Sequence, residues 1–292
     1  MDRLVRSLVI VLLLACIAGC ATPAEPTPVP PTATVPPPTA TVPPTATVPP
    51  TVEPSATPEP TATPAPEPIV ITDPVLEARL RAALGIPEGD ITVEDALAVT
   101  ELDLSVEWQP QIPEDTQFVD ISALSHFTNL TSLTISFNRV ADIAPLAGLT
   151  ELTSLSIGGN RVVDLSPLVG MRKLRGLEIF SNLIEDLSPL AELHELDFLH
   201  ADRNLFTDIT PLAGLTRLTH LDLGYCPVSD ISALAELKSL GRLILHETQV
   251  SDLTPLKGLP LKRLLLDKCP ISDYSPIADI YPQLEEKDFE LP

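Results

Sequence analysis

From Asp120 onward the chain repeats one pattern of apolar and polar positions every 22 residues. In one repeat, the apolar Leu155 and Ile157 alternate with the polar Ser154 and Ser156, which predicts a short strand with its apolar side inward. Because the pattern recurs, successive strands are predicted to stack in parallel, about 4.8 Å apart. The period is marked by Asp120, Asp142, Asp164, Asp186, Asp208, Asp230 and Asp252, and Asp273 comes one residue early.

A second set of apolar positions in each repeat predicts a continuous core. In the same repeat these positions are Leu149, Leu152, Val162, Leu165 and Leu168. A single repeat is too short to bury them, so the predicted stability comes from the stacking of neighbouring coils. The low aromatic content, 4% of residues, fits a core assembled from many copies of a small aliphatic unit.

One polar position interrupts the apolar pattern of each repeat. It holds Asn138, Asn160, Asn182 and Asn204, and then Cys226, Thr248 and Cys269. A buried amide here can bond the backbone of its own coil and of the adjacent one, and leaving it unpaired costs about 1–3 kcal/mol. We predict that the four asparagines form a structural ladder.

The repeated aspartates suggest a column of calcium ligands, but their surroundings favour turns. Asp164 precedes a tight turn, in which its oxygens accept nearby backbone N–H groups. Ser166 is expected to cap the short helix that follows, and Pro167 stands where a helix begins. We therefore predict no metal in this column.

Both ends of the repeat array are predicted to carry caps. Asp73 and Pro74 begin an amphipathic helical pattern that Gly85 ends, and a second helix follows Ile91. The chain then supplies a first, irregular strand around residues 102–104. At the other end, residues 284–291 predict a last partial strand whose charged side chains protect its exposed edge.

The N-terminal segment has the features of a bacterial lipoprotein signal. Arg3 and Arg6 precede an apolar run over residues 8–17, which is shorter than the roughly 20 residues that span a bilayer. The run ends in Ile17-Ala18-Gly19-Cys20, which resembles the bacterial lipobox. By that resemblance Cys20 becomes the acylated, palmitate-bearing residue that anchors the protein to a membrane, because two or more acyl chains give stable attachment.

A proline-rich segment follows the signal. Of the 33 prolines, 18 lie between Pro23 and Pro68. Proline fixes φ and removes a hydrogen-bond donor, so this linker is predicted to be extended and without helix or sheet.

The repeat over residues 149–168 resembles the leucine-rich repeat, and its turn Asp164-Leu165-Ser166-Pro167-Leu168 resembles that of the bacterial internalins. The resemblance implies an α/β leucine-rich-repeat solenoid with parallel strands on a concave face, short 3-10 turns on a convex face and a helical N-terminal cap. It also implies binding through the concave face. We divide the chain into a signal peptide (1–19), a disordered linker (20–68), a helical cap (69–104), leucine-rich repeats (105–281) and a C-terminal cap strand (282–292).

The outward strand positions are not uniform along the array. The first regular coils offer Ser, Thr and Gly, whereas the middle coils offer larger side chains with chemical character. The predicted partner-binding residues are Phe180, Phe198, His200, His220, Asp222, Tyr225, Arg242 and His246. Because exposed aromatics with arginine serve as anchors in protein interfaces, we predict that an extracellular protein or peptide binds here.

His200 raises an alternative, because Glu178 and Asp222 occupy its position in the two adjacent coils. Two carboxylates would raise the pKa of the imidazole, which could then sense pH or bind a metal with His220 or His246. The nearest hydroxyl in that column, on Ser156, is roughly 9–10 Å from His200, whereas a nucleophile and its base need about 2.6–3.2 Å. We predict no enzyme, no cofactor and no metal.

The positions of the remaining cysteines argue against a disulfide, and the net charge argues against a nucleic-acid partner. Cys226 and Cys269 lie two coils apart, roughly 9–10 Å, which exceeds the 7 Å limit of a disulfide, so we predict two free, buried thiols. The net charge of −22 argues against nucleic acid, which needs a basic surface. We expect a monomer on the outside of a bacterial cell. The alternative to a protein ligand is a structural or adhesive role in which the surface binds wall or surface glycan.

Overall fold

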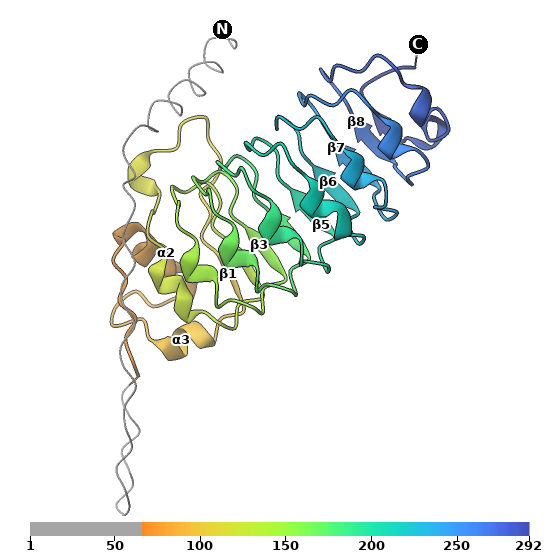
Figure 1. Cartoon of the computed structure of the whole chain (residues 1–292). Coiled ribbons are helices and arrows are strands. Elements are labelled where there is room, and N and C mark those ends of the chain that lie inside the picture. The colour runs from red at the N-terminus through yellow and green to blue at the C-terminus, as the bar shows by residue number, and fades with distance from the viewer. Residues whose placement is uncertain (1–65, 292) are drawn as a thin grey trace, which may run out of the picture. The chain divides into compact units, whose positions relative to one another are not determined.

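The computed structural model describes residues 66–291, which form the predicted α/β leucine-rich-repeat solenoid (Figure 1). Nine strands within this range pair in parallel and in chain order in one sheet. They are β1 (Glu101–Asp103), β2 (Ser132–Thr134), β3 (Ser154–Ser156), β4 (Gly176–Glu178), β5 (Phe198–His200), β6 (His220–Asp222), β7 (Arg242–Ile244), β8 (Arg263–Leu265) and β9 (Glu286–Lys287).

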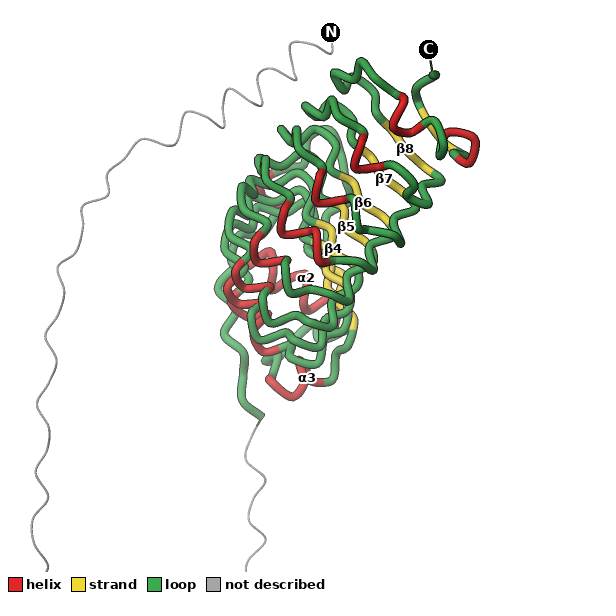
Figure 2. Tube along the Cα trace, turned by 45° about the vertical axis from the view of Figure 1, so that its right-hand side comes forward, coloured by secondary structure: helices red, strands yellow, loops and turns green. Residues whose placement is uncertain are grey.

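Short 3-10 helices lie on the side of the coils opposite the strands (Figure 2). In the repeats they are η3 (Ser122–His126), η4 (Ala144–Leu146), η5 (Ser166–Leu168), η6 (Ser188–Leu190), η7 (Thr210–Gly214), η8 (Ser232–Leu234), η9 (Thr254–Leu256) and η10 (Ser275–Ile277). Further ones are η2 (Glu114–Thr116) before the first regular coil and η11 (Tyr281–Gln283) near the C-terminal end. Each coil therefore contributes one strand and one tight helical turn.

The strand register places equivalent residues of successive coils side by side. Ser154 pairs with Ser132 on one side and with Gly176 on the other, so partners are 22 residues apart. The apolar residues Leu155 and Ile157 are almost fully buried. Between them lies Ser156 on the opposite face, as the alternation predicts. The core thus runs without interruption through the array.

The asparagine position forms a ladder of buried hydrogen bonds. Asn182 donates from Nδ2 to the carbonyls of Ile179 and Phe180 in its own coil and of Ile157 in the preceding one. Its Oδ1 accepts from the backbone N–H of Val162, at 2.9 Å. Asn138, Asn160 and Asn204 also donate from Nδ2 to backbone carbonyls of their own coil and of the coil before it. Each asparagine therefore connects its own coil to the coil before it through hydrogen bonds to the backbone.

The residue before each ladder position has a left-handed backbone. Positive φ values between 50° and 65° occur at Phe137, Gly159, Ser181, Arg203, Tyr225, Glu247 and Lys268. Residues other than glycine adopt this backbone conformation at a cost of roughly 1–2 kcal/mol. The bend turns the chain from the strand face into the interior, where the next residue joins the ladder.

The repeated aspartates stabilise the turns that precede the 3-10 helices. Asp164 Oδ1 accepts from Ser166 N at 2.7 Å, and its Oδ2 accepts from Ser166 Oγ at 2.8 Å. The expectation that Ser166 caps the helix is wrong, because η5 has no side-chain cap and the serine hydroxyl donates to Asp164 instead. Ser166 is itself the first residue of the helix, so its hydroxyl faces backwards toward the carboxylate.

These turns predict that stability falls at acid pH. Hydrogen bonds from the residue two positions ahead lower the pKa of Asp164, Asp186, Asp230, Asp252 and Asp273 below 3.8. A carboxyl with a depressed folded-state pKa contributes stability that is complete above about pH 4 and is lost as pH falls through the lowered values. The urea concentration at the midpoint of unfolding should stay constant from pH 7 to about pH 5 and decline below pH 4. Replacing Asp164 and Asp186 by Asn should make the decline shallower; a midpoint that stays constant down to pH 2.5 would contradict this role.

Two helices close the N-terminal end of the array. Asp73 caps α2 (Pro74–Leu84) by accepting from two backbone N–H groups, and Gly85 ends it in a left-handed conformation. Thr92 caps α3 (Val93–Leu97) through a reciprocal pair of bonds with Asp95. Both helices and the irregular first strand lie where the sequence predicts them. Across residues 66–291, the structure contains no helix with the length and hydropathy needed to span a membrane.

The C-terminal end is covered by a short strand and an aromatic cluster. β9 has two residues and pairs with β8. Phe289 stacks on Tyr274 with ring centroids 5.4 Å apart.

Cys226 is a buried free thiol, and burial raises its pKa to about 12. Cys269 is only half-buried, which corrects the expectation of two buried thiols, because the coil after it is incomplete.

The predicted signal peptide (1–19), the predicted lipid-anchor residue Cys20 and residues 20–65 of the predicted linker lie outside the described part of the chain. The last linker residues are within it. Pro68 forms a β-bridge with Thr92, and Ile69 N donates to Ile91 O at 2.8 Å.

Candidate functional site

The outward side chains of β4 to β8 form columns across the sheet. His200 pairs with Glu178 on β4 and with Asp222 on β6, and Asp222 in turn pairs with Ile244. The neighbouring column places His220 between Phe198 and Arg242. Each coil thus contributes the same two outward positions, and their chemistry changes from coil to coil.

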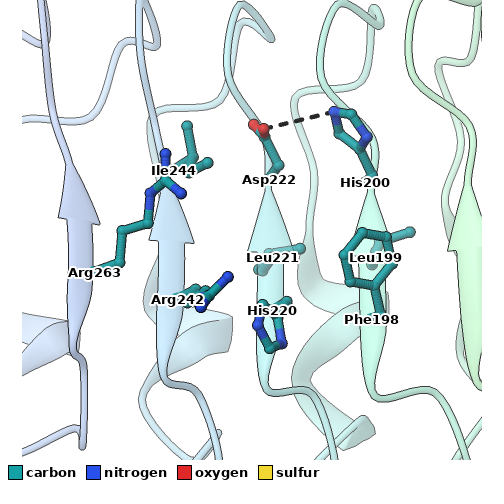
Figure 3. Close-up of a pocket in the computed structure, with 9 residues that line it drawn as sticks. All are labelled: Phe198, Leu199, His200, His220, Leu221, Asp222, Arg242, Ile244 and Arg263. Atoms are coloured by element: carbon teal, nitrogen blue, oxygen red, sulfur yellow. Dashed lines mark ion pairs between the residues drawn. The ribbon is translucent and has the colours of Figure 1, made fainter. Parts of the chain in front are cut away.

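A shallow pocket of about 180 Å³ lies on this face between β5 and β8 (Figure 3). It is lined by Phe198, Leu199, His200, His220, Leu221, Asp222, Arg242, Ile244 and Arg263. Pockets for drug-sized molecules measure roughly 300–1,000 Å³. The hollow therefore has the size of one or two amino-acid side chains.

One end of the pocket is cationic and aromatic. The ring of Phe198 lies 5.9 Å from that of His220, whose Nδ1 is hydrogen-bonded to the hydroxyl of Thr219 at 2.7 Å. Burial and the nearby Arg242 lower the pKa of His220 and favour its neutral form. Arg263 pairs with Glu286 at 3.1 Å, whereas Arg242 is exposed and has no ion-pair partner among the residues described.

The other end combines an imidazole with two carboxylates. His200 Nε2 lies 2.9 Å from Asp202 Oδ1 and 3.6 Å from Asp222 Oδ2 (Figure 3 draws the second pair). Burial disfavours the imidazolium, but the close side-chain contact with Asp202 and the charges of Asp202, Asp222 and Glu178 outweigh it and raise the pKa of His200. Burial also raises the pKa of Asp222, against the opposing hydrogen bond from Gly224 N.

The predicted partners of His200 need correction. Glu178 accepts a hydrogen bond from Ser156 Oγ at 2.6 Å. It therefore acts on the pKa of His200 only as a more distant negative charge. His220 bonds Thr219, and His246 Nδ1 lies 3.3 Å from Asp288 Oδ2. Neither histidine therefore meets His200. The sequence analysis missed one partner, Asp202. It lies two residues after His200 and projects from the same face of the extended chain.

The two phenylalanines are half-buried rather than exposed. Phe180 lies over Gly158, where an added Cβ would come within 2.2 Å of the ring. Its ring also packs against Phe137 at 5.5 Å and His200 at 4.8 Å. The glycine leaves room for a flat ring along the sheet, which explains why a large side chain here is partly covered.

Tyr225 and His246 lie beside the pocket and do not line it. The guanidinium of Arg203 is 4.2 Å from the centre of the Tyr225 ring, and it also pairs with Asp202. Tyr225 keeps 39% of its surface exposed. The structure therefore brings together Phe198, His200, His220, Asp222 and Arg242 of the predicted set. Arg263 and Ile244 also line the pocket, and both occupy outward strand positions in the sequence pattern.

The comparisons with known proteins agree with this architecture. The profile for leucine-rich repeats (2 copies) matches residues 128–170 and 150–192. No curated protein matches the chain. These repeats and the parallel sheet define a leucine-rich-repeat protein.

Similarity to solved structures identifies the family within the leucine-rich-repeat proteins. Internalin C2 from Listeria monocytogenes is 32% identical with a TM-score of 0.70, over 76% of this chain and 96% of that one. A leucine-rich-repeat protein of Leptospira interrogans shares the fold, with 24% identity and a TM-score of 0.55, over 65% of this chain and 54% of that one. The chain therefore belongs to the internalin family of bacterial leucine-rich-repeat proteins. Such folds are typically scaffolds for protein–protein interaction rather than enzymes.

Proposed function

We propose that this protein is a lipid-anchored binding module of the bacterial cell surface, which recognises an extracellular protein or peptide through the strand face of β4 to β8. In this proposal acylated Cys20 holds the chain at the membrane. The proline-rich linker places the repeats at a distance from it, since an extended chain spans about 3.1 Å per residue.

The observation that carries the proposal is the change of chemistry along one column of the sheet. Ser132, Ser154 and Gly176 are followed by Phe198, His220 and Arg242 at the same position of later coils. Only the later group lines the pocket. Aromatic residues and arginine are the side chains that most often dominate binding energy in protein interfaces.

The charges of the pocket indicate what a partner presents. Arg242 has no ion-pair partner within residues 66–291, and Arg263 Nε is buried without a hydrogen-bond acceptor there. Ile244 supplies an apolar wall beside them. An acidic side chain flanked by an apolar one would pair with Arg242 and fill a hollow of this size.

Site-specific photo-crosslinking tests the proposal. A photoreactive phenylalanine analogue replaces Phe198 in one variant and Ser154 in a second, and each protein is irradiated with extracellular material from its environment. Ser154 is the matched control, because it holds the same position two coils earlier. We expect a protein adduct at position 198 and none at position 154. Equal labelling at both positions, or adducts with glycan alone, would contradict a discrete protein site.

A further inference from the structure

Three potential metal ligands converge beside the pocket, at the end that His200 and Asp222 line. They are His200 Nε2, Asp202 Oδ1 and Asp222 Oδ2, and one ligand atom from each residue lies within 4.8 Å of the others. His200 ends β5, Asp202 follows that strand, and Asp222 ends the adjacent β6. The sheet register therefore fixes the three side chains relative to one another.

The burial of Asp202 is a second, independent observation at this set of contacts. Its side chain is only 7% exposed, and Oδ1 has no hydrogen-bond donor among the described residues. His200 Nε2 lies 2.9 Å away and forms an ion pair with it, so the only group that pairs with this oxygen among the described residues is itself a potential metal ligand. Buried carboxylate oxygens are costly unless they are paired or coordinate a metal. This buried oxygen lies within 4.8 Å of the other two ligand atoms.

The spacing of these atoms suits one small ion. Ligand atoms bound tetrahedrally at about 2.0–2.1 Å are about 3.3 Å apart. The two distances from His200 Nε2, 2.9 Å to Asp202 and 3.6 Å to Asp222, lie on either side of that value. A small movement of side chains would bring all three atoms around one centre.

The remaining atoms of the three side chains are held by neighbours. Gly224 N donates to Asp222 Oδ1 at 2.9 Å, which leaves Oδ2 to face His200. Arg203 pairs with Asp202 Oδ2. Phe180 packs on the imidazole ring with centroids 4.8 Å apart. Such outer contacts orient metal ligands in protein sites.

We infer that His200, Asp202 and Asp222 bind one divalent first-row transition metal ion of the zinc type. The imidazole nitrogen favours zinc and its neighbours over calcium and magnesium, which take oxygen ligands. Two carboxylates balance the charge of the ion. Asp222 and His200 keep 22% and 32% of their side chains exposed, so the open side of the site faces solvent. A water, or a ligand atom from a bound partner, completes the coordination there.

Calorimetric titration of the untagged full chain with Zn²⁺ tests the site without any partner. We expect one ion per chain, a higher melting temperature with zinc, and no such response to Ca²⁺ or Mg²⁺. His200→Gln and Asp222→Asn should each weaken binding at least 100-fold. The matched control is His194→Gln, because His194 is an exposed histidine outside the site, and this variant should bind zinc as the parent does.

Cobalt provides a second readout that depends on direct coordination. Co²⁺ should give visible absorption bands in the parent protein that zinc displaces, and His200→Gln should lose them. Absence of stoichiometric binding in the parent, or unchanged binding in His200→Gln, would overturn the inference and leave the cluster as an ion pair only. Since these titrations contain no partner, their failure would leave the proposed protein recognition standing.

Discussion

Replacing Asn182 by alanine is expected to lower the free energy of unfolding by about 3–5 kcal/mol. The amide is 5% exposed. Its Nδ2 donates to three carbonyl oxygens, each of which keeps one other donor, and its Oδ1 accepts from the N–H of Val162. Each lost bond contributes about 0.5–1.5 kcal/mol, and the Val162 N–H left without a partner costs about 1–3 kcal/mol. The loss also weakens the contact between two coils, which the stability of a solenoid requires. Urea unfolding followed by circular dichroism measures the change.

Two further variants separate the ladder from a general effect of losing an amide. Asn129 is exposed and donates one bond to Leu97 O, so Asn129→Ala should cost at most about 1.5 kcal/mol. Asn182→Cys should fall between the two, because Cys226 fills the same position with one accepted and one donated contact. If Asn182→Ala and Asn129→Ala lowered stability equally, the ladder would not be a major source of stability.

The second large effect concerns binding. Once the partner is captured, Phe198→Ala combined with Arg242→Ala should weaken its affinity about 100-fold or more. Anchor residues of an interface contribute about 2 kcal/mol or more each, and 1.4 kcal/mol corresponds to a tenfold change. Both side chains line the pocket, and Arg242 has no ion-pair partner among the described residues to compete for it.

The control for this prediction lies in the same column. Ser132→Ala combined with Ser154→Ala changes the outward face of β2 and β3 and should leave the affinity within a factor of two or so. Titration calorimetry on both double variants, with matching urea midpoints, distinguishes loss of contact from loss of fold. Equal weakening by the two pairs would place the contact over the whole sheet rather than at the pocket.

The fold was predictable because one physical rule repeats along the chain. The alternation around Leu155 defines a strand, and its recurrence after 22 residues requires neighbouring strands to lie in register. The same reasoning placed His200 beside Asp222, which the structure confirms. Periodicity therefore predicts which side chains are neighbours between coils.

The site was predicted less completely, because column neighbours are only part of each environment. Asp202 contacts His200 from the same stretch of chain, and the period of two along an extended segment was the signal for it. The burial of Phe180 depends on the glycine one coil before it. The hydroxyl of Ser166 bonds Asp164 because of the turn conformation. Such details depend on local backbone geometry, which a hydrophobic pattern does not specify.

Hydroxyl-radical footprinting of the free and partner-bound protein tests most directly whether the strand face of β4 to β8 is the binding surface. We predict that oxidation of Phe198 and Tyr225 slows severalfold in the complex, while Trp108 and Tyr281, which lie outside the pocket, react at the same rate in both states. Protection of Trp108 or of the 3-10 helices, with Phe198 unchanged, would contradict the account.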